Sequence, residues 1–312
     1  MSLSTLPILS LADAPTRFAA AVGESFRAFG FALVCDHGLD EALIRHGLEL
    51  TRALFALPEA EKRRYYDPTG AGARGYTPFG TEIAKGSAVH DLKEFWHIGR
   101  SLPAGHPLLS PSMPPNNWPD RPEGFRECFE QLFAEFDRVG AEILSRIALH
   151  LGLGEDWFVP AIADGNSVLR LLHYPPMAED SAGAIRAGAH EDINLITLLL
   201  GAEEEGLEIR TGEGEWIGLS PPPGALVVNI GDMLQRLTNH ALPSTTHRVR
   251  NPATERSACS RYAMPFFLHL RSDFSLETLP QCITPEQPDR YPQAITADSF
   301  LQQRLREIGL LR

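Results

Sequence analysis

The chain has 312 residues, of which 43% are hydrophobic, and it carries a formal net charge of −12. This length suits one large domain or two small ones, with enough apolar residues for a sizeable core. The acidic balance argues against nucleic acid as a partner. No apolar run approaches about 20 residues, and the start lacks the basic and apolar blocks of a signal peptide, so we expect neither a membrane span nor secretion.

The four cysteines, Cys35, Cys128, Cys259 and Cys282, are scattered and never adopt a Cys-x-x-Cys spacing. They are interpreted as free thiols in a reducing compartment, which predicts a cytoplasmic location. No segment of the sequence indicates an obligate protein partner.

The N-terminal part of the chain is dominated by helical patterns. Apolar side chains at helical spacing predict helices over residues 16–29 and 41–56, followed by a short charged helix over residues 59–66. The basic run at residues 62–64 is interpreted as a solvated helix face, because the protein as a whole is acidic. The glycine-rich stretch 70–86 lacks the spacing and the strand–helix context of a phosphate-binding loop, which argues against a nucleotide site.

A long helix separates this part from a region of strands. Residues 124–151 carry apolar side chains every three to four positions and predict a helix that packs on the outside of a β core. From residue 167 onward, short runs separated by turn signals predict a closed or double-sheet β core. The expected strands are residues 168–174, 193–200, 207–211, 216–219, 225–230, 247–250 and 262–269, with helices at 233–239 and 297–308. Segments 1–122 and 123–312 are expected to form one structural unit.

One histidine and one aspartate stand at the start of an apolar run in this β region. If His190 and Asp192 belong to the strand that continues to residue 200, they project to the same face, because strand side chains alternate. His247 begins a second predicted strand and could face the same space. Two imidazoles and one carboxylate form the 2-His-1-carboxylate triad, which binds Fe(II) and leaves coordination positions open.

Other histidines compete for this role, and we expect none of them to be a ligand. His173 lies on the strand face opposite Tyr174, and His240 lies in a loop without a strand partner. His269 ends the last predicted strand, and His37 is interpreted as a structural histidine in a turn.

A buried arginine is expected beside the metal ligands. Arg261 occupies the ligand-facing register of its strand, ahead of the apolar run at residues 264–268. A guanidinium fork at this place suits a carboxylate held by two parallel hydrogen bonds.

The order of His190, Asp192, His247 and Arg261 resembles that of the isopenicillin N synthase-like members of the Fe(II)/2-oxoglutarate-dependent dioxygenases. The runs GFALVCDHGLD and FALPEAEKRRYYD near the N-terminus resemble the same family. The resemblance implies a mainly β fold with α elements, in which a double-stranded β-helix (jelly-roll) core is flanked by N-terminal helices and one long helix. It also implies an enzyme that couples oxidative decarboxylation of 2-oxoglutarate, to succinate and CO2, to oxidation of a small organic substrate. The implied cofactors are Fe(II), 2-oxoglutarate and O2, with ascorbate as a supporting reductant.

The resemblance assigns roles to residues around the metal. Arg261 and Tyr174 would bind the far carboxylate of 2-oxoglutarate. The family's serine and asparagine at this site are Ala263 and Leu172 here, which weakens the prediction of 2-oxoglutarate binding. Arg170 shares a strand face with Tyr174, so it either reaches the pocket or forms a surface ion pair. No general base is required beyond the metal ligands, and none is assigned.

N-terminal elements line the substrate mouth in the family, which makes Tyr76, Glu82 and Phe95 candidate substrate contacts, with plain packing as the competing interpretation. Two other functions stay open within enzymes: an Fe(II) oxidase that uses no 2-oxoglutarate, as in the isopenicillin N synthase and aminocyclopropane-carboxylate oxidase branches, and an ethylene-forming type. In the oxidase, Arg261 would bind a substrate carboxylate or bicarbonate. A jelly-roll binding protein with an inactive metal site is the alternative outside enzymes.

Overall fold

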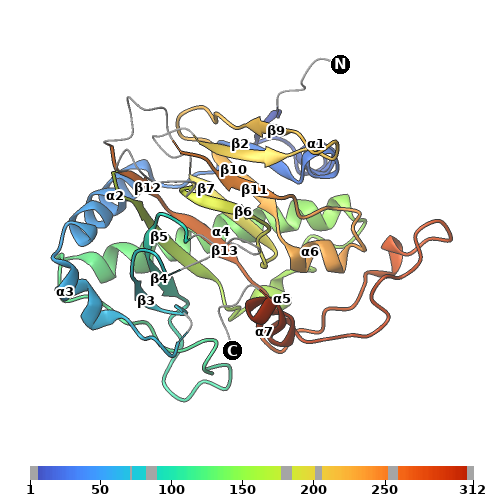
Figure 1. The fold of residues 1–312 in the computed structure, drawn as a ribbon. Helices are drawn as coiled ribbons and strands as arrows, with labels where there is room; N and C mark the ends of the chain where they lie inside the picture. Colours follow the sequence, from blue (N-terminus) through green and yellow to red (C-terminus); the bar gives the residue numbers. More distant parts are fainter. Residues whose placement is uncertain are drawn as a thin grey trace.

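The computed structural model describes residues 6–70, 72–81, 90–176, 185–200, 206–251 and 259–307. Its core consists of a nine-stranded sheet and a four-stranded sheet, with helices gathered outside the larger one (Figure 1). No helix in these ranges is long and apolar enough to cross a membrane.

The larger sheet contains strands from both ends of the chain. Its order is β1 (Ile8–Ser10), β2 (Phe31–Cys35), β10 (Leu226–Ile230), β7 (Ile196–Leu200), β13 (Pro265–Leu268), β5 (Val168–Tyr174), β4 (Glu94–Gly99) and β3 (Gly75–Thr77). A ninth strand, β12 (Arg261–Ala263), pairs with the far end of β5. Strands that precede and follow residue 122 therefore share one hydrogen-bonded sheet.

The smaller sheet carries two of the predicted metal ligands. Its order is β6 (Ala187–His190), β11 (His247–Val249), β8 (Leu207–Arg210) and β9 (Trp216–Gly218). In the antiparallel pair of β6 and β11, His190 lies directly opposite His247. Cross-strand partners in such a pair have Cβ atoms about 4.5–5.5 Å apart, so the pairing brings the two imidazoles together.

Helices cover the outer face of the larger sheet. The longest, α4 (Phe125–His150), buries an apolar stripe on that face and passes behind the strands in Figure 1. Its Phe136 ring stacks on Phe266 of β13 with ring centres 5.5 Å apart. Helices α1 (Pro15–Phe29) and α2 (Glu41–Phe55) pack against α4. The remaining helices are α3 (Glu59–Lys62), α5 (Val159–Ile162), α6 (Asp232–Leu237) and α7 (Ala297–Glu307), of which α7 lines the cavity described below, with 3-10 turns at Arg63–Tyr65 and Pro280–Cys282.

Two predicted strands differ from those observed. The strand expected at 262–269 is interrupted at Met264, and its halves β12 and β13 pair with opposite ends of β5. The strand expected at 193–200 begins only at Ile196, because the preceding residues form a loop held by the start of α6. In that loop Leu195 accepts a hydrogen bond from the Gly231 backbone at 2.8 Å. A Cβ on Gly231 would lie 2.2 Å from the Asn194 carbonyl oxygen, so this approach requires glycine.

The prediction of a solvated basic run at residues 62–64 is wrong for Lys62. Arg63 and Arg64 are exposed, but Lys62 is only 5% exposed. Its ammonium group lies 2.7 Å from a carboxylate oxygen of Glu94, on the helix-covered face of β4. The sequence did not reveal this partner because Glu94 is supplied by a strand 32 residues away along the chain.

Candidate active site

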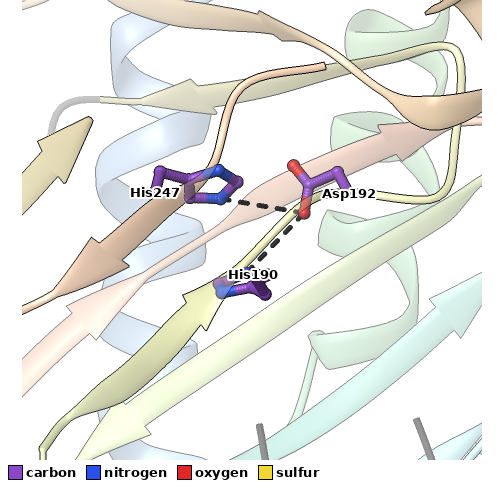
Figure 2. A group of neighbouring side chains, drawn as sticks. All are labelled: His190, Asp192 and His247. Atoms are coloured by element: carbon purple, nitrogen blue, oxygen red, sulfur yellow. Dashed lines mark ion pairs between the residues drawn. The ribbon is translucent and has the colours of Figure 1, made fainter. Parts of the chain in front are cut away.

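Three side chains from the smaller sheet and its neighbouring loop converge at one end of the core. The Nε2 atoms of His190 and His247 each lie 3.8 Å from Oδ1 of Asp192. Figure 2 shows all three groups pointing toward one another. Their ligand atoms lie within 4.8 Å of one another, and no other trio of this kind occurs in the described ranges. Atoms spaced this way surround a point roughly 2.2–2.5 Å from each, slightly beyond the roughly 2.0–2.2 Å of metal–imidazole and metal–carboxylate bonds.

Backbone carbonyl groups orient both imidazoles. Nδ1 of His190 lies 2.7 Å from the Gly188 oxygen, and Nδ1 of His247 lies 3.1 Å from the Thr245 oxygen. Donation from Nδ1 places the proton there and leaves the Nε2 lone pair for a metal ion. Burial, the largest effect, lowers the pKa of His190 to about 4, although part of its ring edge meets the cavity described below. Both the hydrogen bond and the pKa therefore favour the neutral, metal-binding form of this imidazole at neutral pH.

Asp192 is held by a loop and not by the strand parity that the sequence suggested. Strand β6 ends at His190, so the argument that alternate strand residues share a face does not apply. The Asp232 backbone N–H of α6 donates to the Asp192 carbonyl oxygen at 2.7 Å. This contact, made by the residue that starts α6, turns the aspartate back toward the two histidines.

Two buried polar side chains fix the carboxylate of Asp192. Thr197 donates to Oδ2 at 2.6 Å, and Asn229 donates to the same oxygen at 2.8 Å. Burial acts to raise the pKa of Asp192, but the two histidines and these hydrogen bonds outweigh it, so the pKa is lowered. The carboxylate is therefore ionised. Sequence reasoning missed Thr197 and Asn229, although a lone asparagine within the apolar run of β10 was a signal of a buried polar contact.

A cavity of about 450 Å³ opens beside the triad. His190 and Asp192 line it together with Arg74, Arg170 and His269, and residues of α7 complete the lining. Arg304 of α7 forms an ion pair with Asp232 at 2.8 Å, which fixes the helix against α6. The volume lies within the range of small-molecule sites, so the open side of the metal site has room for a small organic ligand.

The predicted 2-oxoglutarate residues lie together at the Tyr174 end of β5, whereas Val168 at the opposite end lines the cavity. Arg261 and Tyr174 are cross-strand partners, and the guanidinium carbon lies 5.1 Å from the centre of the Tyr174 ring. Arg261 is only 2% exposed. Ala263 and Leu172 are also cross-strand partners, so the two departures from the family pattern form one apolar pair beside Arg261. A second buried arginine, Arg186, lies 5.9 Å from the Tyr174 ring and was missed by sequence reasoning.

The candidate substrate contacts have different places in the structure. Phe95 is 2% exposed, and its ring lies 4.3 Å from the guanidinium carbon of Arg170, which lines the cavity. Phe95 therefore supports a cavity residue from behind. Tyr76 pairs with Trp96 across β3 and β4 and lies on the same helix-covered face of the sheet. There the Tyr76 hydroxyl donates to Glu94. Its assignment as a substrate contact is not supported, because strand pairing turns it away from the cavity. Glu82 lies outside the described residues.

Replacing Tyr76 with phenylalanine tests its assignment to packing. The change removes a hydroxyl that donates to a buried carboxylate, so the free energy of unfolding should fall by about 1.5–3 kcal/mol. Denaturant unfolding followed by circular dichroism measures this loss. Fe(II) affinity should stay unchanged. A variant with normal stability but weakened ligand binding would show that Tyr76 is a binding residue after all.

The other histidines have partners or positions that separate them from the metal site. His173 lies 2.7 Å from Glu94 and 3.0 Å from the Ser260 hydroxyl, on the helix-covered face of β5. His240 contacts the Tyr291 hydroxyl at 2.5 Å, and His37 contacts the Gly224 carbonyl at 2.7 Å. His269 lines the cavity but is not part of the triad.

Comparison with known proteins agrees with this geometry. The model of the 2OG-Fe(II) oxygenase superfamily matches residues 165–270, and that of the N-terminal region of non-haem dioxygenases in morphine synthesis matches residues 3–121. The chain is 31% identical to the 2-oxoglutarate-Fe(II) type oxidoreductase hxnY of Emericella nidulans over 295 residues, which covers 91% of this chain and 83% of that protein.

Solved structures share the whole fold. A Caulobacter crescentus protein assigned to the 2OG-Fe(II) oxygenase family is 52% identical, with a TM-score of 0.91 over 98% of this chain and 100% of the other. A full-length Neurospora crassa protein, solved in complex with alpha-KG, is 26% identical, with a TM-score of 0.87 over 98% of this chain and 97% of the other. The predicted jelly-roll core is confirmed, and the chain belongs to the superfamily of 2-oxoglutarate- and Fe(II)-dependent oxygenases.

Proposed function

We propose that this enzyme oxidises a small organic substrate in the cavity beside His190 and Asp192, with Fe(II) held by those two residues and His247. The observation that carries the proposal is the convergence of the three ligand atoms within 4.8 Å of one another at the edge of a cavity of about 450 Å³. These three residues would hold Fe(II) from one side and would leave its cavity side for small ligands.

The donor set fits Fe(II) and a dianionic co-substrate. Two neutral imidazoles and one carboxylate reduce the charge of a divalent ion from +2 to +1, which suits the binding of an anion. When bound, Fe(II) supplies the electrons that activate dioxygen, while 2-oxoglutarate supplies the further pair through its decarboxylation. The protein's own residues orient the ligands, and burial of Asp192 and His247 keeps bulk water from two of the three ligands.

We assign the far carboxylate of 2-oxoglutarate to Arg261, with Tyr174 beside it. An arginine that is 2% exposed and lies over a tyrosine ring can supply charge-assisted hydrogen bonds in a dry environment. The apolar pair of Ala263 and Leu172 removes two polar contacts from the same place, so Arg261 has to supply most of the binding free energy.

That apolar pair also supports a second candidate, an Fe(II) oxidase in which Arg261 binds a carboxylate of the substrate itself or bicarbonate. The substrate would then bring its own reducing electrons. Relatives named for 2-oxoglutarate favour the first candidate, but the two make different predictions for the isolated protein.

Anaerobic titration separates them. The Fe(II) protein should develop a visible metal-to-ligand charge-transfer band when 2-oxoglutarate is added, and it should form succinate slowly once oxygen is admitted without a substrate. Oxygen uptake and succinate release, measured together, should be equal. Iron binding without a band or succinate would support the oxidase, and absence of iron uptake would refute both. The Arg126→Gln variant, which changes an exposed ion pair on α4, is the matched control.

We also propose that the protein works in the reducing environment of the cytoplasm. All four cysteines are free in the structure, which supports this location.

A further inference from the structure

A further buried arginine, Arg74, lines the cavity, whereas Arg261 does not line it. Arg74 is 7% exposed and lies just before β3. Its guanidinium rests on the backbone of Gly99, where a Cβ would lie only 2.0 Å from the guanidinium carbon. The absence of a side chain at Gly99 therefore creates the space that the guanidinium occupies.

Arg74 has no acidic partner within the described part of the chain. Its Nη1 donates to its neighbour's carbonyl oxygen, on Ala73, at 2.7 Å, and its Nη2 donates to the side-chain oxygen of Asn166 at 3.3 Å. Its Nε is buried and has no hydrogen-bond partner there. Burial lowers the pKa of Arg74 to about 10, which still leaves the group charged at neutral pH. A guanidinium carries five N–H donors, so most of its capacity is unused.

The other cations with full charge at the cavity differ from Arg74. Lys93 forms an ion pair with Asp91 at 2.9 Å, and Arg304 pairs with Asp232 at 2.8 Å. The Nε of Arg170 donates to His97 at 2.6 Å, and its guanidinium lies over the ring of Phe95. Arg74 thus places a buried positive charge, uncompensated by any described carboxylate, in a cavity that it shares with the metal ligands.

This charge is too far from Arg261 to serve the same ligand. Gly99, under the Arg74 guanidinium, pairs with Val168 at one end of β5, whereas Arg261 pairs with Tyr174 at the other end. The six steps between Val168 and Tyr174 span about 20 Å of extended strand. This distance greatly exceeds the length of a five-carbon diacid, so 2-oxoglutarate held by Arg261 cannot also neutralise Arg74.

We propose that Arg74 binds a carboxylate of the primary substrate, so that the enzyme acts on a small monocarboxylic acid whose acid group lies at the Gly99 end of the cavity. The inference rests on the proposed function, because it takes the ligand in this cavity to be the molecule that is oxidised. The positive charge of Arg74, which no described carboxylate compensates, matches one negative charge on the ligand. A planar carboxylate can accept two parallel hydrogen bonds from the guanidinium fork, and Glu191 at the same cavity opposes a second negative charge.

Two neighbours complete the subsite. The amide of Asn166 accepts from Arg74 and donates to the Ser112 carbonyl at 2.9 Å, which fixes its orientation. His269 is 9% exposed and lines the same cavity, and its ring nitrogens make no hydrogen bond within the described ranges. It can therefore donate to the second carboxylate oxygen or to a polar group next to it.

Calorimetric titration with matched pairs of neutral and charged probes tests the proposal. Linear, branched and aromatic monocarboxylates, such as hexanoate and phenylacetate, are each compared with the primary amide of the same skeleton. Titrations use the anaerobic Fe(II) protein with and without 2-oxoglutarate. Carboxylates should bind about 10- to 100-fold more tightly than their amides, the range expected for charge-assisted hydrogen bonds.

Two variants assign that preference to Arg74. Arg74→Gln should remove the preference for carboxylates and leave the 2-oxoglutarate charge-transfer band unchanged. Gly99→Ala retains the charge but displaces the guanidinium, so it should reduce the preference at least about tenfold. Gly99→Ala also decides the matter if Arg74→Gln fails to fold. Arg126→Gln should behave like the unmodified protein.

Several outcomes would overturn the assignment. These are equal affinity for acids and amides across the panel, a preference that survives both variants, or loss of 2-oxoglutarate binding in Arg74→Gln, which would place Arg74 in the co-substrate site. If the unmodified protein shows no 2-oxoglutarate band but keeps an Arg74-dependent preference for acids, the co-substrate assignment fails and the acid-binding subsite stands.

Discussion

Replacing Asp192 with alanine is expected to abolish stoichiometric Fe(II) binding and to lower succinate formation by more than about 100-fold. Loss of an outer hydrogen-bond partner of a metal ligand costs about 10- to 100-fold in affinity or activity, and loss of the ligand itself should exceed that range. The carboxylate is also the only anionic ligand of the triad, so its removal raises the charge at the site by one unit. Anaerobic equilibrium dialysis with Fe(II), together with a succinate assay, measures both effects.

Thr197→Val provides a graded comparison for this variant. It keeps the carboxylate and removes the hydrogen bond that Thr197 donates to Oδ2 at 2.6 Å. Its Fe(II) affinity should fall between those of the unmodified protein and Asp192→Ala. Full iron occupancy in a folded Asp192→Ala protein would show that the metal is held elsewhere.

Replacing Arg261 with glutamine should weaken 2-oxoglutarate binding by about 2–5 kcal/mol, roughly 30-fold or more, because a buried charge pair loses one partner. The apolar pair of Ala263 and Leu172 offers no alternative polar contact, which places this variant toward the upper part of that range. The charge-transfer band, followed against 2-oxoglutarate concentration, reports the change, while Fe(II) affinity should stay the same.

Ala263→Ser is the counterpart of Arg261→Gln. A serine hydroxyl beside Arg261 would add one hydrogen bond to the distal carboxylate and should tighten binding by about tenfold. Unchanged 2-oxoglutarate affinity in both variants would refute the assignment of this site, and it would favour an enzyme in which Arg261 binds a different anion.

The metal ligands could be predicted from sequence because histidine and aspartate side chains are themselves typical ligands of Fe(II). Their convergence could not be derived in the same way. His190 and His247 meet because β6 and β11 pair antiparallel in one register, and that pairing depends on the assembled sheet. For Asp192 the prediction reached the right residue through the wrong element. The turn that aims it needs Gly231 and the start of α6, which lie about 40 positions away along the chain.

Residues outside the triad show where sequence reasoning ends. Tyr76 and Phe95 looked alike as candidates, but the register of β3 on β4 puts them on opposite faces of one sheet. Lys62 looked solvated, and its burial depends on Glu94 from a distant strand. Arg74 stood in a glycine-rich stretch without any pattern around it. Only the packing of its guanidinium on Gly99 and the absence of an acidic neighbour in the described ranges give it significance.

The ion pair between Arg304 and Asp232 joins α7, near the C-terminus, to the start of α6. Asp232 begins α6, and its backbone holds the loop that aims Asp192 at the histidines, while its buried carboxylate needs the cation that α7 supplies. Docking of the final helix and alignment of a metal ligand therefore share one residue. A displacement of α7 would therefore remove the cation beside Asp232, the residue whose backbone holds the loop that carries Asp192.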